Sequence, residues 1–293
     1  MSMNEFLVGT ANFDQPYGLD KSRQGLARED IVEILTLLES LTCAGIDTAP
    51  DYGRSEEILG KVMRQMNVSS KITTKIPMAN YNSSDRTVDA VRGSLKRLQV
   101  SAVDTILFHG YSNDFVEHSG VLRESSKRIL DLGLAKKVGL TCYSEEEIVK
   151  GKEMVPELSV FQVPENVLDQ RLCKSTQLVN LQNDGCIFYL RSIFLQGLLL
   201  IDTENFEGIS DNWRRQLKMF ERNAEACGLS RTAYCIAYAK SIPWASGIVV
   251  GTESVRQLKE FIVLYSHSYE NLSFDLEPGS IDLIDPRRWT TQT

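Results

Sequence analysis

An eightfold alternation of short apolar runs with amphipathic helical patterns most strongly constrains how this chain can fold. The first helical pattern places Ile31, Ile34, Leu35 and Leu38 at the spacing of one helix face, and Gly45 follows it. Strands that alternate with helices pair in parallel, because each helix returns the chain to the same end of the sheet. The predicted strands are residues 6–10, 46–49, 71–76, 103–108, 137–142, 160–163, 186–190 and 247–250.

The number and length of these units select one architecture. Eight strand–helix units within 293 residues match a closed (β/α)₈ barrel better than an open, doubly wound sheet. The first predicted strand is not followed by a G-x-G-x-x-G segment, so a Rossmann domain has no support. We therefore predict an α/β protein with a single TIM-barrel domain over residues 1–293 and an irregular tail from about residue 266.

Charge and hydropathy narrow the range of partners. The chain has 32 basic and 39 acidic residues, for a formal net charge of −7, and it has no Lys/Arg run. This balance argues against a nucleic-acid or anionic-membrane surface, because binding phosphates requires clustered positive charge. No stretch approaches the ~18 apolar residues of a membrane span, and residues 1–5 lack the features of a signal peptide. We expect a cytoplasmic protein of undetermined oligomeric state.

The cysteines and histidines do not form a metal-binding pattern. The chain has three histidines and six cysteines, without a C-x-x-C pair or a spacing suited to zinc. We expect reduced, mostly buried cysteines and no metal site. The cysteines are Cys43, Cys142, Cys173, Cys186, Cys227 and Cys235.

Polar residues follow three consecutive predicted strands. Asp47 ends the second strand, Tyr52 lies in the next loop, Lys75 ends the third strand, and His109 ends the fourth. Taken singly, each residue is equally compatible with a purely structural role. Asp47 would cap a helix, Tyr52 would be a half-buried loop aromatic, Lys75 would be solvated, and His109 would be a core histidine. In a (β/α)₈ barrel, however, the active site lies at the carboxyl ends of the strands. Their joint occurrence therefore predicts a catalytic group.

Several segments resemble the aldo-keto reductase family. The most diagnostic is the run G-I-D-T-A-P-D-Y-G-R-S-E over residues 45–56, followed by Leu59 and Gly60. Thr74 and Lys75 resemble the lysine strand of the family, residues 104–109 its histidine strand, and residues 138–141 its "iGvS" strand. The resemblance implies an NAD(P)H-dependent barrel oxidoreductase, with Tyr52 as proton donor and Asp47, Lys75 and His109 completing a catalytic tetrad.

Carbonyl reduction requires residues of these types. Hydride addition to a carbonyl places negative charge on oxygen, which calls for a proton donor and preorganised hydrogen-bond donors. The ordinary pKa of tyrosine, ~10, is high for proton transfer at neutral pH, and an adjacent ammonium lowers it. Lys75 would supply that charge, Asp47 would hold the lysine, and His109 would donate to the substrate oxygen. The cofactor carries the hydride, so no metal is required.

The resemblance also implies a cofactor site for NADP(H) or NAD(H). Thr141, Gln162 and Asn166 correspond to residues near the nicotinamide carboxamide, and Cys142 replaces a frequent asparagine. Arg191 stands where many members place a tyrosine against the nicotinamide, and an exposed or salt-bridged arginine is the alternative. The remaining implied cofactor residues are Gly9, Thr10, Ser192, Gln196, Gly197, Gly251, Thr252, Ser254, Gln257 and Glu260.

The phosphate-binding turn leaves the choice between the two cofactors open. Ser254-x-x-Gln257 precedes the last helix, where backbone N–H groups can bind phosphate, but it is also an ordinary capping box. Gln257 takes the position of an arginine found in NADP-preferring members, and Glu253 would oppose a 2′-phosphate. Phe261 replaces the usual asparagine beside Glu260.

Two further segments resemble a bacterial branch of the family that is often associated with polysaccharide or sugar metabolism. These are residues 191–199, with the sequence RSIFLQGLL, and residues 285–289. We expect Trp289 to dock the tail rather than reach over the barrel mouth. The leading hypothesis is reduction of a small aldehyde, ketone or sugar, or the reverse reaction. The alternatives are a nucleotide-binding regulatory subunit, as in potassium-channel β-subunits, and a non-redox barrel enzyme.

Overall fold

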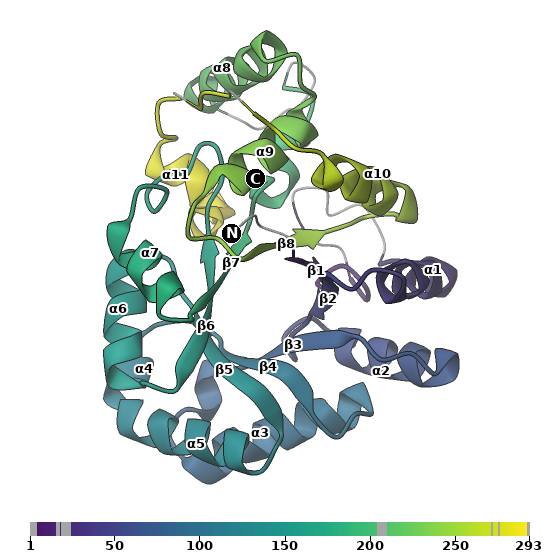
Figure 1. Ribbon diagram of the computed structural model, residues 1–293, viewed down its shortest axis with the longest axis vertical. Coiled ribbons are helices and arrows are strands. Elements are labelled where there is room, and N and C mark those ends of the chain that lie inside the picture. The colour runs from purple at the N-terminus through teal and green to yellow at the C-terminus, as the bar shows by residue number, and fades with distance from the viewer. Residues whose placement is uncertain are drawn as a thin grey trace.

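Eight parallel strands close into a barrel in chain order, and helices surround it (Figure 1). The computed structural model describes residues 5–15, 18, 25–203, 210–270, 272–274 and 276–291. The opening residues 1–4, which bear on the signal-peptide expectation, lie outside the described residues. The barrel closes where the last strand pairs with the first, with Leu7 opposite Val249. The predicted (β/α)₈ fold is confirmed.

Each predicted strand is present: β3 and β4 have the predicted bounds, and the bounds of the other six differ by one or two residues. The strands are β1 (Glu5–Gly9), β2 (Ala44–Asp47), β3 (Lys71–Ile76), β4 (Val103–Phe108), β5 (Ala135–Thr141), β6 (Leu158–Pro164), β7 (Ile187–Arg191) and β8 (Gly247–Gly251). The helices are α1 (Arg28–Glu39), α2 (Ser55–Met66), α3 (Ser84–Leu98), α4 (Asn113–Glu117), α5 (Ser119–Asp131), α6 (Glu145–Met154), α7 (Thr176–Asn183), α8 (Asp211–Ala226), α9 (Arg231–Ser241), α10 (Val255–Ser266) and α11 (Ile281–Ile284). Short 3₁₀ turns are η1 (Met78–Asn80), η2 (Leu195–Leu200) and η3 (Pro286–Thr291).

Serine caps define where several helices begin. The hydroxyls of Ser144, Ser210, Ser230 and Ser254 each accept a hydrogen bond from the backbone N–H three residues later. These bonds satisfy N–H groups that have no partner within the helix. Two of these helices, α6 and α10, therefore start within a few residues of the strands β5 and β8 that precede them.

The interior of the barrel is filled by alternate residues of its strands. Leu7, Leu107, Val160 and Tyr189 form a buried cluster of their own, whereas their strand neighbours belong to the large core between the strands and the helices. Side chains alternate between the two faces of a strand, so the residue two positions later also points inward. At the carboxyl ends these next inward positions are Gly9, His109, Gln162 and Arg191. The fold thus directs several of the predicted site residues toward one mouth.

Some helical segments differ from the expectation. The helix expected around residues 117–132 is preceded by a separate turn, α4. The helix α7 was not anticipated, because Leu178 is its single buried residue and its apolar stripe is weak. The tail expected to be irregular from about residue 266 instead contains α11 and η3. Trp289 explains this order, since its ring packs 5.8 Å from that of Trp213, which supports docking of the tail.

The described residues form no disulfide, no cluster of metal ligands and no membrane-spanning helix. All six cysteines are free, three of them buried and three half-buried. Within the described ranges, no three His, Cys, Asp or Glu side chains come together as metal ligands. No helix in the same part of the chain is long and apolar enough to cross a bilayer.

Candidate active site

A buried ion pair forms the floor of the barrel mouth. Lys75 Nζ lies 2.6 Å from Asp47 Oδ2 and donates to the carbonyl oxygen of Thr48 at 3.0 Å. The two charged side chains are 3% and 4% exposed. Burial works to lower the pKa of Lys75, but the Asp47 carboxylate and the neighbouring Tyr52 outweigh it, so the pKa is raised above its ordinary value. The lysine is therefore held as an ammonium.

Tyr52 lies beside this ammonium. Lys75 Nζ is 4.8 Å from the centre of the Tyr52 ring, which is half-buried in the loop between β2 and α2. The backbone N–H of Ser55 donates to the Tyr52 carbonyl at 3.1 Å, and the Ser55 hydroxyl donates to the Thr10 carbonyl at 2.8 Å. The loop is thus fastened to the end of β1, with the phenol next to a fixed positive charge.

His109 follows β4 and faces the same group. Its backbone N–H donates to the Ile76 carbonyl at 3.0 Å, and its Nδ1 lies 3.4 Å from Asp51 Oδ2. Burial and then the Lys75 charge lower the pKa of His109, against the opposing effect of Asp51 and Asp47. Its imidazole is therefore neutral at pH 7 and can donate one hydrogen bond. The structure brings all four predicted catalytic residues to one mouth.

Gln162 belongs to the same group, although the sequence placed it in the cofactor site. Its side-chain Nε2 donates to Asp47 Oδ1 at 2.5 Å, and the residue is 1% exposed. Asp47 therefore uses one oxygen for Lys75 and the other for Gln162. The inward position of Gln162 on β6 could be read from strand alternation, but its partner on the opposite side of the barrel could not.

A second buried carboxylate ties the tyrosine helix to the lysine strand. Glu56, 1% exposed in the first turn of α2, accepts from Thr74 Oγ1 at 2.6 Å and from Arg97 Nε at 2.7 Å. Thr74 precedes Lys75 on β3, and Arg97 lies at the end of α3. In the sequence, Glu56 stands out only as the last residue of the run over residues 45–56. In the fold it links the element after Tyr52 to the strand that carries Lys75.

Residues on the β5 and β6 side of the predicted cofactor set have different surroundings. Thr141 is buried at the inward-facing end of β5, two residues after Gly139. Cys142 points the other way into the main hydrophobic core, where burial raises the pKa of its thiol well above the usual range. The Cys142 side chain is thus not brought to the mouth. Asn166 donates to the Ser192 carbonyl at 3.3 Å and joins the loops after β6 and β7.

The segment after β7 has an unusual backbone. Ser192, Leu195 and Gln196 have φ values of 60°, 48° and 53°, and Gly197 has a φ of 91°. Residues other than glycine rarely adopt this left-handed backbone conformation, and each instance costs about 1–3 kcal/mol. Such strain is common at ligand-binding segments, and the predicted cofactor residues Ser192, Gln196 and Gly197 lie within it.

Several polar groups near β1 and β8 already form hydrogen bonds within the protein. Thr10 Oγ1 donates to Thr48 Oγ1 at 2.8 Å. The Ser254 hydroxyl accepts from the Gln257 N–H at 3.2 Å, and Gln257 Oε1 accepts from the Glu253 N–H at 2.8 Å. The second bond reaches the N–H of the residue before the cap rather than that of Ser254, so the arrangement is a variant of the predicted capping box, and Gln257 is used to begin α10.

The other predicted residues of this side differ in exposure. Gly9 is half-buried at the end of β1, Thr252 is buried, and Gly251 and Glu260 are exposed. Phe261 stacks edge-on against Phe6 at 5.2 Å, which explains an aromatic residue beside Glu260.

A comparison with known families identifies this arrangement. The profile described as "Aldo/keto reductase family" matches residues 5–275. The chain belongs to the aldo/keto reductase family. Membership indicates an oxidoreductase and supports NAD(P)H-dependent carbonyl reduction in general.

Two curated relatives share part of this aldo/keto reductase sequence. One is the "Probable voltage-gated potassium channel subunit beta" of Oryza sativa subsp. japonica, 24% identical over 79% of this chain and 81% of its own length. Another is "Aldo-keto reductase YhdN" of Bacillus subtilis, 27% identical over 60% of this chain and 56% of its own length.

Solved aldo-keto reductases share the fold at lower identity. The holo form of AKR11C1 from Bacillus halodurans has a TM-score of 0.73 at 19% identity, over 91% of this chain and 88% of that one. The thermostable Tm1743, in complex with the inhibitor epalrestat, has a TM-score of 0.69 at 19% identity, over 95% and 92% of the two chains. These likenesses concern the barrel alone.

Proposed function

We propose that this protein reduces an aldehyde, ketone or sugar carbonyl to an alcohol with NADPH or NADH, or catalyses the reverse oxidation. The observation that carries the proposal is the buried Asp47–Lys75 pair beside the ring of Tyr52. An ammonium held in a nearly dry site stabilises a phenolate far more effectively than one in water does. Family membership supports the same class of reaction.

Each residue of the group has a distinct role in this proposal. A bound nicotinamide supplies or accepts the hydride. Tyr52 gives its phenolic proton to the oxygen of the substrate, and Lys75 stabilises the phenolate that remains. Asp47 keeps Lys75 charged and in place, with Gln162 orienting its second oxygen. The neutral His109, in the tautomer that carries its proton on Nε2, donates a hydrogen bond to the same substrate oxygen.

The residues at the mouth fit a nicotinamide dinucleotide. The hydroxyl of Thr141 and the amide of Gln162 lie at the inward ends of β5 and β6, where they match the donors and acceptors of a carboxamide. The N-terminus of α10, capped by Ser254, offers backbone N–H groups to a phosphate. We leave NADP(H) and NAD(H) as equal candidates, and we propose a cytoplasmic enzyme with a small carbonyl compound or sugar as its partner.

A regulatory role is the second candidate. The specific observation in its favour is the 24% identity to the probable potassium channel β-subunit. Such a protein would bind the nucleotide but turn substrate over slowly. Turnover, rather than cofactor binding, therefore separates the two functions.

The test combines cofactor titration with substitution of the tyrosine. We expect NADPH or NADH to saturate the protein at micromolar concentrations, followed by reduction of at least one aldehyde in a carbonyl screen. Tyr52→Phe should lower kcat by about 10²-fold or more and leave the cofactor Kd within twofold, because the hydroxyl acts mainly in the transition state. Tyr269→Phe, which alters a hydroxyl bonded to the Leu264 carbonyl, is the matched control. Unchanged turnover in Tyr52→Phe would contradict the proposed mechanism.

A further inference from the structure

Two arginines from distant parts of the chain contact the ring of one aromatic side chain at the barrel mouth. Tyr143 follows β5, and its ring centre lies 4.4 Å from the guanidinium carbon of Arg191 and 3.7 Å from that of Arg287. Arg191 ends β7, whereas Arg287 belongs to η3 in the C-terminal tail. The backbone N–H of Tyr143 donates to Glu147 Oε2 at 2.6 Å, which fixes the start of this loop.

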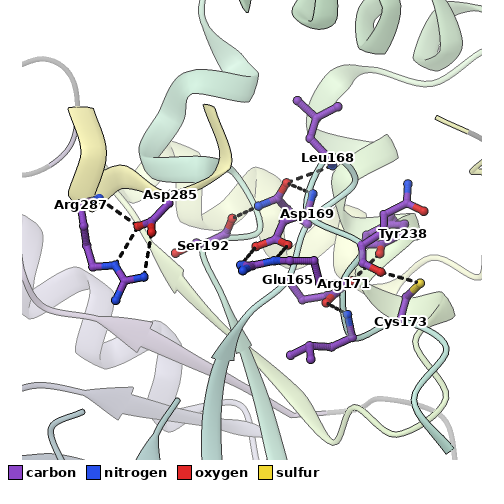
Figure 2. Close-up of polar contacts among 12 residues, drawn as sticks. Glu165, Leu168, Asp169, Arg171, Cys173, Ser192, Tyr238, Asp285 and Arg287 are labelled. Atoms are coloured by element: carbon purple, nitrogen blue, oxygen red, sulfur yellow. Dashed lines mark hydrogen bonds and ion pairs between the residues drawn. The ribbon is translucent and has the colours of Figure 1, made fainter. Parts of the chain in front are cut away.

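The two arginines differ in how their charges are balanced. Arg287 donates through Nε and Nη2 to the two oxygens of Asp285, at 2.8 and 2.7 Å, as Figure 2 shows. The nearby Glu147 accepts from Tyr143 at one of its oxygens. Arg191 is half-buried, and within the part of the chain that the structure describes its guanidinium has no recorded hydrogen bond or ion pair. The uncompensated positive charge at this corner is therefore that of Arg191.

Strand register directs this charge toward the reaction site. Tyr189 faces the barrel interior and pairs with Gln162, while Arg191 pairs with Pro164. Arg191 therefore points inward two residues beyond Gln162, or roughly 7 Å along the strand. Because Gln162 touches Asp47, the Arg191 side chain leaves its strand one inward layer above the catalytic group, and its guanidinium rests against Tyr143.

An unpaired cation in such a place favours an anionic ligand. Removing a guanidinium from bulk water without a counter-charge is costly, and a bound anion offsets that cost. Stacking on Tyr143 holds the guanidinium plane while leaving its N–H groups free, which suits bidentate recognition of a carboxylate.

We propose that Arg191 binds a carboxylate on the substrate, so that the preferred substrate is a carbonyl compound with an acidic group a few ångströms from the reacting carbon. Sugar acids and other oxo acids belong to this class. This inference rests on the proposed function and narrows it from carbonyl compounds in general to anionic ones. The other source of an oxyanion in the same mouth is a phosphate of the cofactor.

The test measures equilibrium binding, so it does not depend on turnover. We would titrate the protein with 4-formylbenzoate and with its methyl ester by calorimetry, at fixed low ionic strength, with and without NADPH. The wild type should bind the acid at least tenfold more tightly than the ester. Arg191→Gln should bring that ratio close to one, and Arg191→Lys should lie between them, because an ammonium keeps the charge but not the planar fork. Both variants would be checked for wild-type melting behaviour.

A neighbouring arginine provides the control. Arg288→Gln removes the same charge from the adjacent tail, where Arg288 lies 3.3 Å from Asp282, and should leave the acid-to-ester ratio unchanged. Equal affinity of the wild type for acid and ester would overturn the inference. A ratio preserved in Arg191→Gln together with weakened NADPH binding would overturn it as well and assign Arg191 to the cofactor, at its nicotinamide or at a phosphate. If the wild type prefers the acid to the ester but reduces no carbonyl compound, the result would contradict the proposed function and leave the carboxylate site standing.

Discussion

The buried ion pair between Asp47 and Lys75 makes a quantitative prediction about stability. Asp47→Asn keeps the size of the side chain but leaves the Lys75 ammonium without a counter-charge. At the observed separation of 2.6 Å, two unit charges attract by roughly 6 kcal/mol if the effective dielectric constant is ~20. The amide oxygen of Asn and the Thr48 carbonyl, 3.0 Å from Nζ, retain part of this. We therefore expect the free energy of unfolding to fall by about 3 kcal/mol, at the lower end of values for broken buried pairs.

The loss should depend on pH in a defined direction. In the wild type the pKa of Lys75 is raised, so its stabilising contribution is present at neutral pH and is lost only as the pH rises through the folded-state pKa. In Asp47→Asn, burial without a counter-charge lowers the pKa of Lys75 below that of an unfolded lysine. The unfolded state then binds more protons, and the stability of the variant rises with pH in that interval. The difference between wild type and variant should be greater at pH 7 than at pH 9.5.

Urea denaturation at the two pH values provides the measurement. Asp89→Asn is the matched control, because Asp89 and Arg92 form a pair 3.3 Å apart in which both side chains are more than half exposed. Such a pair contributes about 0–1 kcal/mol, so the control should unfold almost as the wild type does. A loss in Asp47→Asn no greater than that in Asp89→Asn, or one that grows toward pH 9.5, would refute the reasoning.

Two further predictions concern packing and a buried acid. Gly60→Ala should destabilise the protein by about 1–3 kcal/mol, because the added Cβ on α2 would lie 2.6 Å from the carbonyl carbon of Leu98. Gly120→Ala is the control: its Cβ would have nothing within 4 Å, so stability should change by less than about 1 kcal/mol. Thermal unfolding compares the two variants, and similar melting temperatures would contradict the close packing at Gly60. Burial raises the pKa of Glu165 to about 8, so its proton is retained in the folded state and the stability of the wild type should fall from pH 5 to pH 8. Glu165→Gln should therefore gain stability relative to wild type over this interval, and a urea-midpoint difference independent of pH would argue against a neutral Glu165.

The architecture follows from periodicities that are visible along the chain. Strand and helix patterns depend on neighbouring residues, and eight strand–helix units of this length favour a closed barrel over an open sheet. The same pattern located Asp47, Lys75 and His109, because polar residues at the ends of buried strands stand out from their apolar surroundings. Strand alternation also shows why Thr141 and Cys142, adjacent in sequence, face opposite sides of β5.

The helices with weak amphipathic patterns could not be predicted from local sequence. The α7 segment has little amphipathic signal, and its position after β6 is decided by the cap at Ser175 and by packing of Leu178. The tail forms its short helices because Trp289 finds a surface on Trp213, 76 residues earlier in the sequence. Neither contact leaves a repeat that a sequence pattern could reveal.

Sequence patterns were enough to predict the barrel, its mouth and the residues that we propose for carbonyl reduction. Which of these residues touch one another depends on the folded chain. Gln162 holds Asp47 from the other side of the barrel, and Arg287 from the tail joins Arg191 over Tyr143. Periodicity gives the direction in which a side chain leaves its strand, but its partners depend on how barrel closure and tail docking bring distant segments together.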